Sequence, residues 1–385
     1  TDRQAQRKDL FTPMPITPSI AYFITAHGFG HASRAAAVME AISERLAEVR
    51  FELFTTTAKA FFKNAIGESF GYHAVQSDIG MVQISPLEED LTATCDQLDR
   101  LLPYDPEWIE HLATQLNRLN CRMVICDIAA LGIEVARLAG IPSVLIENFT
   151  WDWIYEGYST KQHRLRPHIT YLTNLFRRVD HHIQTVPLCH RTDSAILIPP
   201  ISRKARSSRC QIRKRLGVPE GEPMVLVTMG GVPDQFEFLS KLPMDLSCYL
   251  IVPGADVRSA DHEKVILLPT HSCFFHPDLM AAADALVGKA GYSTICEAYQ
   301  CGTPFGYIRR SHSPESAALE SFIKEHISSI AIDQASYATG GWIDYLPELL
   351  SLPRDPKRAE NGADAAATYI TTLLQAPKGC VMDER

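Results

Sequence analysis

The sequence has ten cysteines but no Cys-x-x-Cys pair, no apolar run long enough to span a bilayer and no excess of positive charge. The missing pairs argue against a zinc ribbon or a dithiol redox motif, and we expect reduced, mostly buried thiols in a cytoplasmic protein. The missing apolar run argues against a transmembrane segment, although peripheral contact with a membrane stays open. The net charge of −8 argues against nucleic acid as a partner.

Two phosphate-binding motifs are also absent at the first glycine-rich loop, Gly28-Phe29-Gly30-His31. Ser33 stands where a dinucleotide fingerprint has its third glycine, and no Lys-Ser or Lys-Thr pair follows as it does in a Walker loop. The sequence contains no Asp-x-Asp pair either. We therefore expect a glycine loop with a different ligand, and no metal site.

What the first loop does have is a strand before it and a helix after it. The apolar run 20–25 leads into the loop, and an alanine-rich helix is expected from Arg34 onward. In open α/β sheets ligands bind at the carboxyl ends of strands, where small residues let a ligand approach the backbone. A histidine placed there could act as a general base, although a tight turn with a capping histidine is the alternative.

Strand-like and helix-like runs alternate along the chain, which predicts an α/β protein with parallel sheets. The alternation breaks after Ile198, where prolines and charges without periodicity indicate a linker, and it restarts at Met224. We expect two Rossmann-like domains whose sheets face each other across a cleft. The expected segments are a loose tail at 1–18, an N-terminal domain at 19–198, a linker at 199–215, a C-terminal domain at 216–356, a helix at 357–374 that packs back on the N-terminal domain, and a tail at 375–385.

A second strand, glycine loop and helix occupy 285–300. Backbone N–H groups at the start of such a helix suit a diphosphate. Glu297, one turn into the helix, could accept hydrogen bonds from two ribose hydroxyls, or it could complete a capping box with Ser293 or Thr294. Lys289 could contact a phosphate, or it could be solvated.

A third feature is Asp127, which ends an apolar run and therefore lies at the same rim of the sheet as His31. A buried carboxylate would orient the ring of the histidine and stabilise its protonated form. The alternative is that Asp127 caps the helix that follows it.

Together with Gly230-Gly231 and Gly302-Thr303-Pro304, these loops resemble the GT-B glycosyltransferases, especially the inverting kind that includes the bacterial lipid-II N-acetylglucosamine transferase and the plant glucosyltransferases. The resemblance runs from Ser19 to about Leu374. A closer likeness is to the glycosyltransferase-like N-terminal half of plant arabinokinases. It rests on the runs 25–32, 148–155 and 286–292. No kinase phosphate loop occurs after Leu350, so this likeness does not carry kinase activity.

The resemblance implies the GT-B fold and a hexosyl- or N-acetylhexosaminyl-transferase. Such an enzyme moves a sugar from a nucleotide-sugar donor, with UDP favoured, to a hydroxyl acceptor with inversion and without a metal. The nucleotide sugar is a substrate, so no cofactor is expected, and the acceptor stays unidentified. The alternatives are a nucleotide-sugar 2-epimerase and a non-catalytic module that binds a sugar nucleotide.

Matching positions to the family assigns roles to single residues. His31 matches the base and Asp127 the carboxylate that orients it, with His27 as the rival base and as an acceptor-binding residue. Trp151 and Asp152 would shape the acceptor site, unless they form a corner of the core. Ser316 stands where most relatives have a side-chain amide, which leaves the donor sugar open. The residues matched to donor binding are Gly28, Gly30, Gly230, Gly231, Phe275 and His276 at the nucleobase, Gly291, Ser293 and Thr294 at the phosphates, Glu297 at the ribose and Glu315 at the sugar.

Overall fold

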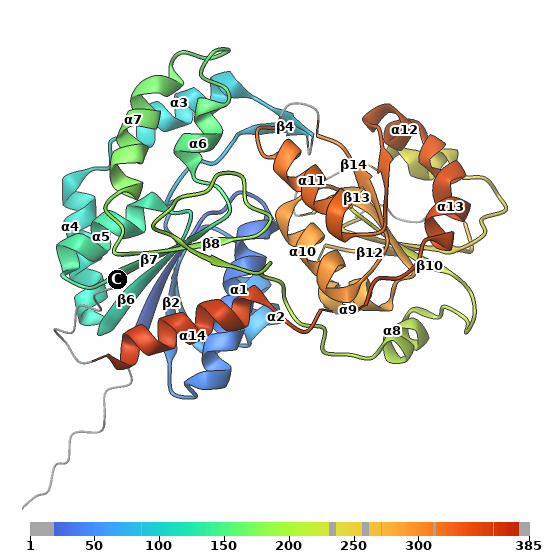
Figure 1. The fold of residues 1–385 in the computed structure, drawn as a ribbon, viewed down its shortest axis with the longest axis horizontal. Coiled ribbons are helices and arrows are strands. Elements are labelled where there is room, and N and C mark those ends of the chain that lie inside the picture. The colour runs from blue at the N-terminus through green and yellow to red at the C-terminus, as the bar shows by residue number, and fades with distance from the viewer. Residues whose placement is uncertain are drawn as a thin grey trace, which may run out of the picture.

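The computed structural model describes residues 19–85, 87–230, 236–255, 262–270, 272–310, 313–356 and 358–376. Two parallel sheets lie side by side, and each is covered by helices on both faces (Figure 1). The predicted α/β class with two Rossmann-like domains is confirmed. The tail predicted at 1–18 and most of the tail predicted at 375–385 lie outside the described residues.

The N-terminal sheet is built from strands that are apolar on both faces, because helices cover both. Ile20 and Ile24 pack against one set of helices and Phe23 packs against the other. The strand order is β3 (Phe70–His73), β2 (Arg50–Phe54), β1 (Ser19–Ile24), β6 (Cys121–Asp127), β7 (Ser143–Glu147), β8 (His181–Thr185) and β9 (Ile196–Ile198).

Helices cover the N-terminal sheet in two layers, each with its own apolar cluster. The last helix begins at Gly362, later than the predicted position 357, because Asn361 caps it by accepting from the Ala363 N–H. It packs against the first helix (Figure 1). One layer contains α1 (Phe29–Arg45), α2 (Lys59–Ile66) and α14 (Gly362–Gln375), and the other contains α3 (Leu91–Leu101), α4 (Pro106–Arg118), α5 (Ala130–Ala139), α6 (Trp151–Glu156) and α7 (Leu165–Phe176).

The C-terminal sheet repeats this plan with six strands. Their order is β12 (Val265–Leu268), β11 (Tyr249–Pro253), β10 (Met224–Thr228), β13 (Ala285–Lys289), β14 (Phe305–Ile308) and β15 (Ser329–Ile332). One face carries α8 (Arg209–Leu216), α9 (His276–Ala282), α10 (Tyr292–Cys301) and α11 (Ser316–His326), and the other carries η1 (Glu237–Lys241), α12 (Gln334–Thr339), η2 (Gly341–Tyr345) and α13 (Leu346–Ser351). A short hairpin of β4 (Gln83–Ser85) and β5 (Glu88–Glu89) belongs to the N-terminal domain.

Each sheet has one point where the chain reverses its direction of winding. In the N-terminal sheet that point lies between β1 and β6, and in the C-terminal sheet it lies between β10 and β13. Ligands of open α/β sheets bind in the crevice beside such a switch point, at the carboxyl ends of the strands. The loops that follow these four strands therefore mark where a site is to be sought.

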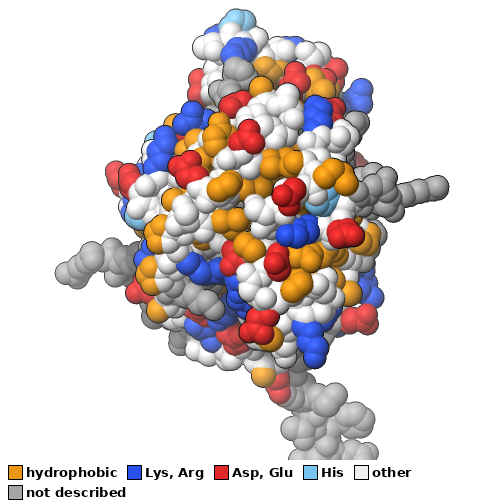
Figure 2. All heavy atoms as spheres, turned by 90° about the vertical axis from the view of Figure 1, so that its right-hand side faces the viewer, with side chains coloured by type: hydrophobic (Ala, Val, Ile, Leu, Met, Phe, Trp, Pro, Cys, Tyr) orange, Lys and Arg blue, Asp and Glu red, His pale blue; other side chains and the backbone are white. Residues whose placement is uncertain are grey.

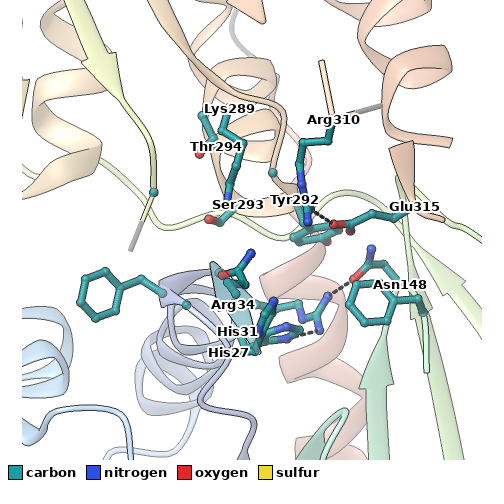
Figure 3. A pocket seen from close by; sticks show the side chains of 17 residues that line it. His27, His31, Arg34, Asn148, Lys289, Tyr292, Ser293, Thr294, Arg310 and Glu315 are labelled. Carbon is teal, nitrogen blue, oxygen red and sulfur yellow. Dashed lines mark hydrogen bonds and ion pairs between the residues drawn. The ribbon is translucent and has the colours of Figure 1, made fainter. Parts of the chain in front are cut away.

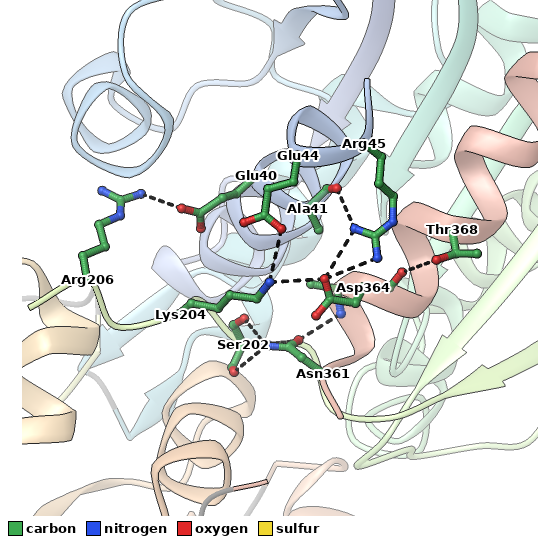
Figure 4. A network of polar contacts seen from close by, with 11 residues as sticks. Glu40, Ala41, Glu44, Arg45, Ser202, Lys204, Arg206, Asn361, Asp364 and Thr368 are labelled. Carbon is green, nitrogen blue, oxygen red and sulfur yellow. Dashed lines mark hydrogen bonds and ion pairs between the residues drawn. The ribbon is translucent and has the colours of Figure 1, made fainter. Parts of the chain in front are cut away.

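The linker between the domains is attached to the N-terminal domain by ion pairs (Figure 4). Arg206 donates to Glu40 at 3.2 Å. Lys204 donates to Glu44 at 3.3 Å and to Asp364 of α14 at 3.2 Å. Exposed pairs of this kind each contribute little to stability, so the network orders the linker without locking it.

The surface of the C-terminal domain carries charges of both signs. Figure 2 shows Lys and Arg side chains interspersed with Asp and Glu side chains on the face at the right of Figure 1. None of the helices in the described ranges combines the length and the apolar character needed to cross a bilayer. The buried cysteines Cys95, Cys121, Cys126, Cys248 and Cys296 are free thiols.

Candidate functional site

A pocket lies between the two domains, where the loops at the two switch points meet (Figure 3). The first glycine loop approaches the second so closely that a Cβ on Gly30 would lie 3.8 Å from the Ser293 hydroxyl oxygen. The pocket is lined by His27, Gly28, Phe29, Gly30, His31, Arg34, Gln83, Asn148 and Phe149 of the N-terminal domain, and by Gly230, Lys289, Gly291, Tyr292, Ser293, Thr294, Arg310 and Glu315 of the C-terminal domain.

Two helices begin at this pocket without a side-chain cap. Helix α1 follows Gly28, whose φ of 68° lies in the left-handed region that favours glycine. Helix α10 follows Gly291, so Ser293 and Thr294 lie within its first turn and their hydroxyls do not cap it. The first N–H groups of an uncapped helix lack partners, and the helix dipole adds positive potential. Both helix starts are therefore suited to an anion.

His31 and Asp127 are in direct contact behind the pocket. The His31 Nδ1 atom lies 2.9 Å from Oδ1 of Asp127, whose side chain is fully buried at the end of β6. Because a carboxylate only accepts, Nδ1 carries the proton and Nε2 is the basic atom of the ring. Burial alone would raise the pKa of Asp127, but the Arg34 guanidinium and the His31 hydrogen bond outweigh burial and lower it. The carboxylate is ionised at neutral pH.

Arg34, one turn further along α1, is a site residue that the sequence analysis missed. Its Nε and Nη2 atoms each donate to the Asp127 carboxylate at 2.7 Å, and its Nη1 donates to the Asn148 amide oxygen at 2.7 Å. The guanidinium carbon lies 4.9 Å from the ring centroid of Tyr292. Arg34 follows His31 by three residues, and this spacing on a predicted helix places both side chains on the same face, which could have identified Arg34 from the sequence.

The segment 74–82 holds His27 in the pocket. The Met81 N–H donates to Nδ1 of His27 at 3.4 Å, which leaves the ring proton on Nε2. A Cβ on Gly80 would lie 2.8 Å from the His27 side chain, so the ring depends on glycine at that position. Burial, with repulsion from His31 and Lys289, lowers the pKa of His27 to about 3. His27 is therefore neutral near pH 7 and offers a hydrogen-bond donor.

Two cations of the C-terminal domain lie on the other side of the pocket (Figure 3). The Lys289 ammonium makes no hydrogen bond or ion pair with any residue that the structure describes. Burial, with repulsion from Arg310, lowers the pKa of Lys289 to about 8. Arg310 donates to Glu315 at 2.6 Å and to Glu89 of the N-terminal domain at 2.7 Å. The pocket thus offers one unpaired cation beside the start of α10.

Glu297 and the two residues matched to the nucleobase lie outside the pocket lining. Oε1 of Glu297 accepts from Arg203 at 2.9 Å, and Oε2 accepts from His276 at 2.9 Å. Burial alone would raise the pKa of Glu297, but Arg203 and His276 lower it. The guanidinium groups of Arg203 and Arg206 lie 5.2 and 4.2 Å from the ring centroid of Phe275. These residues are gathered around the linker, and their positions favour neither the ribose role nor a capping box.

Trp151 and Asp152 also lie outside the pocket lining. Trp151 is 2% exposed and its Nε1–H donates to the Thr25 hydroxyl at 3.1 Å. Asp152 accepts from the Thr173 hydroxyl at 2.6 Å, which ties α6 to α7. The structure places both in the packing of the N-terminal domain, so the acceptor role gains no support from their positions.

The structure therefore brings most of the predicted site together and leaves part of it elsewhere. Asp127 lies directly behind His31, and Gly231 lies outside the described residues. The predicted residues that line the pocket are His27, Gly28, Gly30, His31, Gly230, Gly291, Ser293, Thr294 and Glu315.

Comparisons with known proteins were consistent with this architecture. No family profile matches the chain. It is 27% identical over 371 residues to the L-arabinokinase of Arabidopsis thaliana, and the match covers 94% of this chain and 35% of that protein. The chain thus spans little more than a third of the length of that relative.

Two solved structures are similar in fold. Arabidopsis thaliana UGT89C1, solved with UDP, has a TM-score of 0.60 and 10% identity, covering 93% of this chain and 99% of that one. The spinosyn forosaminyltransferase SpnP has a TM-score of 0.59 and 14% identity, covering 92% of this chain and 94% of that one. These likenesses confirm the GT-B fold expected from the sequence.

Proposed function

We propose that this protein is a glycosyltransferase that moves a sugar from a nucleotide sugar to a hydroxyl acceptor, with inversion and without a metal. One observation carries the proposal. The His31–Asp127 pair at the start of α1 faces the uncapped start of α10 across one pocket. A base and an anion site are thereby set on opposite sides of the space where a reacting carbon would lie.

The proposed reaction is a single displacement. The acceptor hydroxyl gives its proton to Nε2 of His31 while its oxygen forms a bond to the anomeric carbon. The bond from that carbon to the diphosphate oxygen breaks, and its electron pair leaves with the nucleoside diphosphate. Asp127 stays ionised and stabilises the imidazolium that forms.

The leaving diphosphate would be held by the C-terminal domain. The free N–H groups in the first turn of α10 and the Lys289 ammonium lie together at the pocket. Donors that are already oriented toward developing negative charge stabilise it without reorganisation. This arrangement supports departure of the diphosphate without a divalent ion.

The donor is proposed to be a UDP-sugar, as the UDP complex of UGT89C1 suggests. Glu315 lines the pocket and could accept from hydroxyls of the transferred sugar. Contact of Glu297 with the ribose would require Arg203 to move, because Glu297 is only 2% exposed in the present arrangement.

A ligand screen followed by a turnover assay tests the proposal. Binding raises the melting temperature by mass action, so thermal shifts across UDP-, GDP- and dTDP-sugars identify the donor. Release of nucleoside diphosphate is then measured with a panel of hydroxyl acceptors, and the anomeric configuration of the product is read by NMR. We expect acceptor-dependent release, an inverted product and full activity in excess EDTA.

The other outcomes separate the rival functions. Binding without release for every acceptor would favour a non-catalytic sugar-nucleotide module. An altered donor sugar without release would indicate a 2-epimerase. Loss of activity in EDTA that Mg²⁺ or Mn²⁺ restores would overturn the metal-free step.

A further inference from the structure

We propose that Arg34 is a positioning residue that couples the His31–Asp127 pair to the first turn of α10 through Tyr292. The inference rests on the proposed function, because it assigns Arg34 a part in the same reaction. Arg34 belongs to the N-terminal domain, where it binds Asp127 and Asn148, and its guanidinium also lies against Tyr292 of the C-terminal domain.

Arg34 fixes the Asp127 carboxylate in one plane. Its Nε and Nη2 atoms donate hydrogen bonds to the two carboxylate oxygens, one each, at 2.7 Å. A planar guanidinium supports this arrangement and an ammonium does not. The third contact, from Nη1 to Asn148, fixes the guanidinium itself. The direction of the His31 ring follows from the direction of the carboxylate, because Nδ1 of His31 is bonded to Oδ1 of Asp127.

Tyr292 connects the Arg34 guanidinium to the start of α10 in the C-terminal domain. It is the first residue of α10 and is 8% exposed. Its hydroxyl lies 2.8 Å from the Thr185 hydroxyl and accepts from the Ile201 N–H at 3.2 Å, so the start of α10 is anchored on the N-terminal side. The face of the Tyr292 ring lies against the Arg34 guanidinium.

The polar atoms of Arg34 are directed to protein groups, so its role differs from that of a donor-binding residue. A misaligned base lowers the rate of the chemical step more than it lowers binding of the nucleotide. Removing the alignment should therefore reduce kcat while the dissociation constant of UDP stays nearly constant. Arg34 lines the pocket, so this separation of kcat from binding decides between the two roles.

The test uses Arg34→Lys and Tyr292→Leu in the full chain, with Arg213→Lys as the matched control. Arg213 is also a buried arginine, 8% exposed and bonded to Asp284, but it lies outside the pocket. We expect kcat to fall about 10- to 100-fold in Arg34→Lys and less in Tyr292→Leu, because a displacement of about 1 Å costs about 100-fold. The dissociation constant of UDP should change less than threefold in Arg34→Lys.

A spectroscopic readout accompanies the kinetics. The proton on Nδ1 of His31, bonded to a carboxylate, should give a far-downfield NMR signal that is absent in His31→Ala. We expect this signal to be lost or shifted in Arg34→Lys and retained in Arg213→Lys. If Arg34→Lys does not fold, the NMR signal of Tyr292→Leu tests the inference, because Tyr292 contacts the guanidinium and not the carboxylate.

The outcomes separate this inference from the proposed function. A parent protein that turns over no donor counts against the proposed function, and the NMR signal then tests the inference alone. Folded variants with the kcat and the signal of the parent would overturn the inference. Weaker UDP binding with unchanged kcat would also overturn it, because Arg34 would then bind the donor.

Discussion

The two histidines of the first loop differ in the direction of their hydrogen bonds. Nδ1 of His31 donates to an ionised carboxylate, whereas Nδ1 of His27 accepts from the backbone N–H of Met81. A neighbouring carboxylate stabilises an imidazolium as it forms. His27 has no such partner among the described residues, and its pKa is lowered to about 3. The geometry therefore favours His31 over His27 as the base.

Substitution of each histidine tests this assignment. We expect His31→Ala to lower the rate of sugar transfer by about 10²- to 10⁴-fold, the usual effect of losing a general base, while UDP still binds. His27→Ala should lower the rate less and leave the shape of the pH–rate profile unchanged, because a histidine with a pKa of about 3 is neutral near pH 7. Steady-state kinetics from pH 5 to 9 measure both. If His27→Ala were the inactive variant, the roles would be exchanged.

At the residue scale the sequence predicted part of the site, and the reason for the rest is physical. The rule that ligands lie at strand ends selected Asp127 and also fits Lys289 at the end of β13, and the same rule applied to the end of β7 would have added Asn148. Glu297 was assigned from its position in the helix and from the family resemblance. Its partner Arg203 is 94 positions away in the sequence, and no local pattern reveals such a pair.

At the element scale, α10 combines an uncapped start with a nearby lysine whose charge depends on pH. Lys289 is charged below its pKa of about 8 and neutral above it. A bound diphosphate favours the charged form, so affinity must fall as pH rises through that value. The stretch from β13 to α10 therefore predicts an anion site that weakens in alkaline solution.

Calorimetry with UDP checks this expectation. The dissociation constant of UDP should rise up to about tenfold between pH 7 and pH 9, the change that linkage allows for one group titrating near pH 8. Lys289→Met should bind UDP more weakly at pH 7 and show a flatter pH dependence. Lys289→Arg should keep its charge throughout this range. If the dissociation constants of the parent and of Lys289→Met changed with pH in the same way, Lys289 would not contact the bound anion.

The linker is the second element whose role depends on charge. Arg203 and Glu297 form an ion pair in which the arginine side chain is 9% exposed and the glutamate side chain is 3% exposed. Glu297→Ala would leave the arginine buried without this partner. Removing one partner of a buried pair typically costs about 3–5 kcal/mol of stability. Urea unfolding should show a loss of this order for Glu297→Ala, and a smaller loss for the double variant Arg203→Met/Glu297→Leu.

The pH dependence of this pair has a definite sign. The pKa of Glu297 is lowered in the folded state, so the pair contributes stability above the pKa of an unfolded glutamate, and that contribution is lost as pH falls through the folded value. The free energy of unfolding of the parent should therefore approach that of Arg203→Met/Glu297→Leu at acidic pH. Equal stabilities of Glu297→Ala and the parent at pH 7 would mean that Arg203 finds another partner.

At the scale of the whole molecule, the sequence predicted the architecture well because parallel sheets leave a strong local signal. Buried strands read as continuous apolar runs, and each of the two glycine loops follows a strand at the switch point of its sheet. Strand β8 gives a weaker local signal, because polar side chains such as His181 and His182 interrupt its apolar pattern, and β9 is only three residues long. The contacts between domains left no such signal, since they join segments far apart in the chain.

One of these contacts spans the cleft beside the pocket. Glu89 of the β4–β5 hairpin and Glu315 both accept from Arg310, and the Glu89 and Arg310 side chains are 7% and 9% exposed. Domain pairs with modest interfaces move relative to each other, and closure excludes water from a reacting centre. The Glu89–Arg310 pair is formed in the present arrangement of the domains, and the same guanidinium holds Glu315 at the pocket.

Glu89→Gln tests whether this pair holds the domains together. Small-angle scattering with UDP bound should give a larger radius of gyration for Glu89→Gln than for the parent, because a neutral amide binds Arg310 less strongly. We expect kcat to fall about tenfold through incomplete closure, while UDP binding, which the proposed function assigns to the C-terminal domain, changes little. Glu110→Gln, on the exposed face of α4, is the control for loss of one carboxylate. If the two variants match in radius and in kcat, the linker contacts rather than Glu89 set the arrangement of the domains.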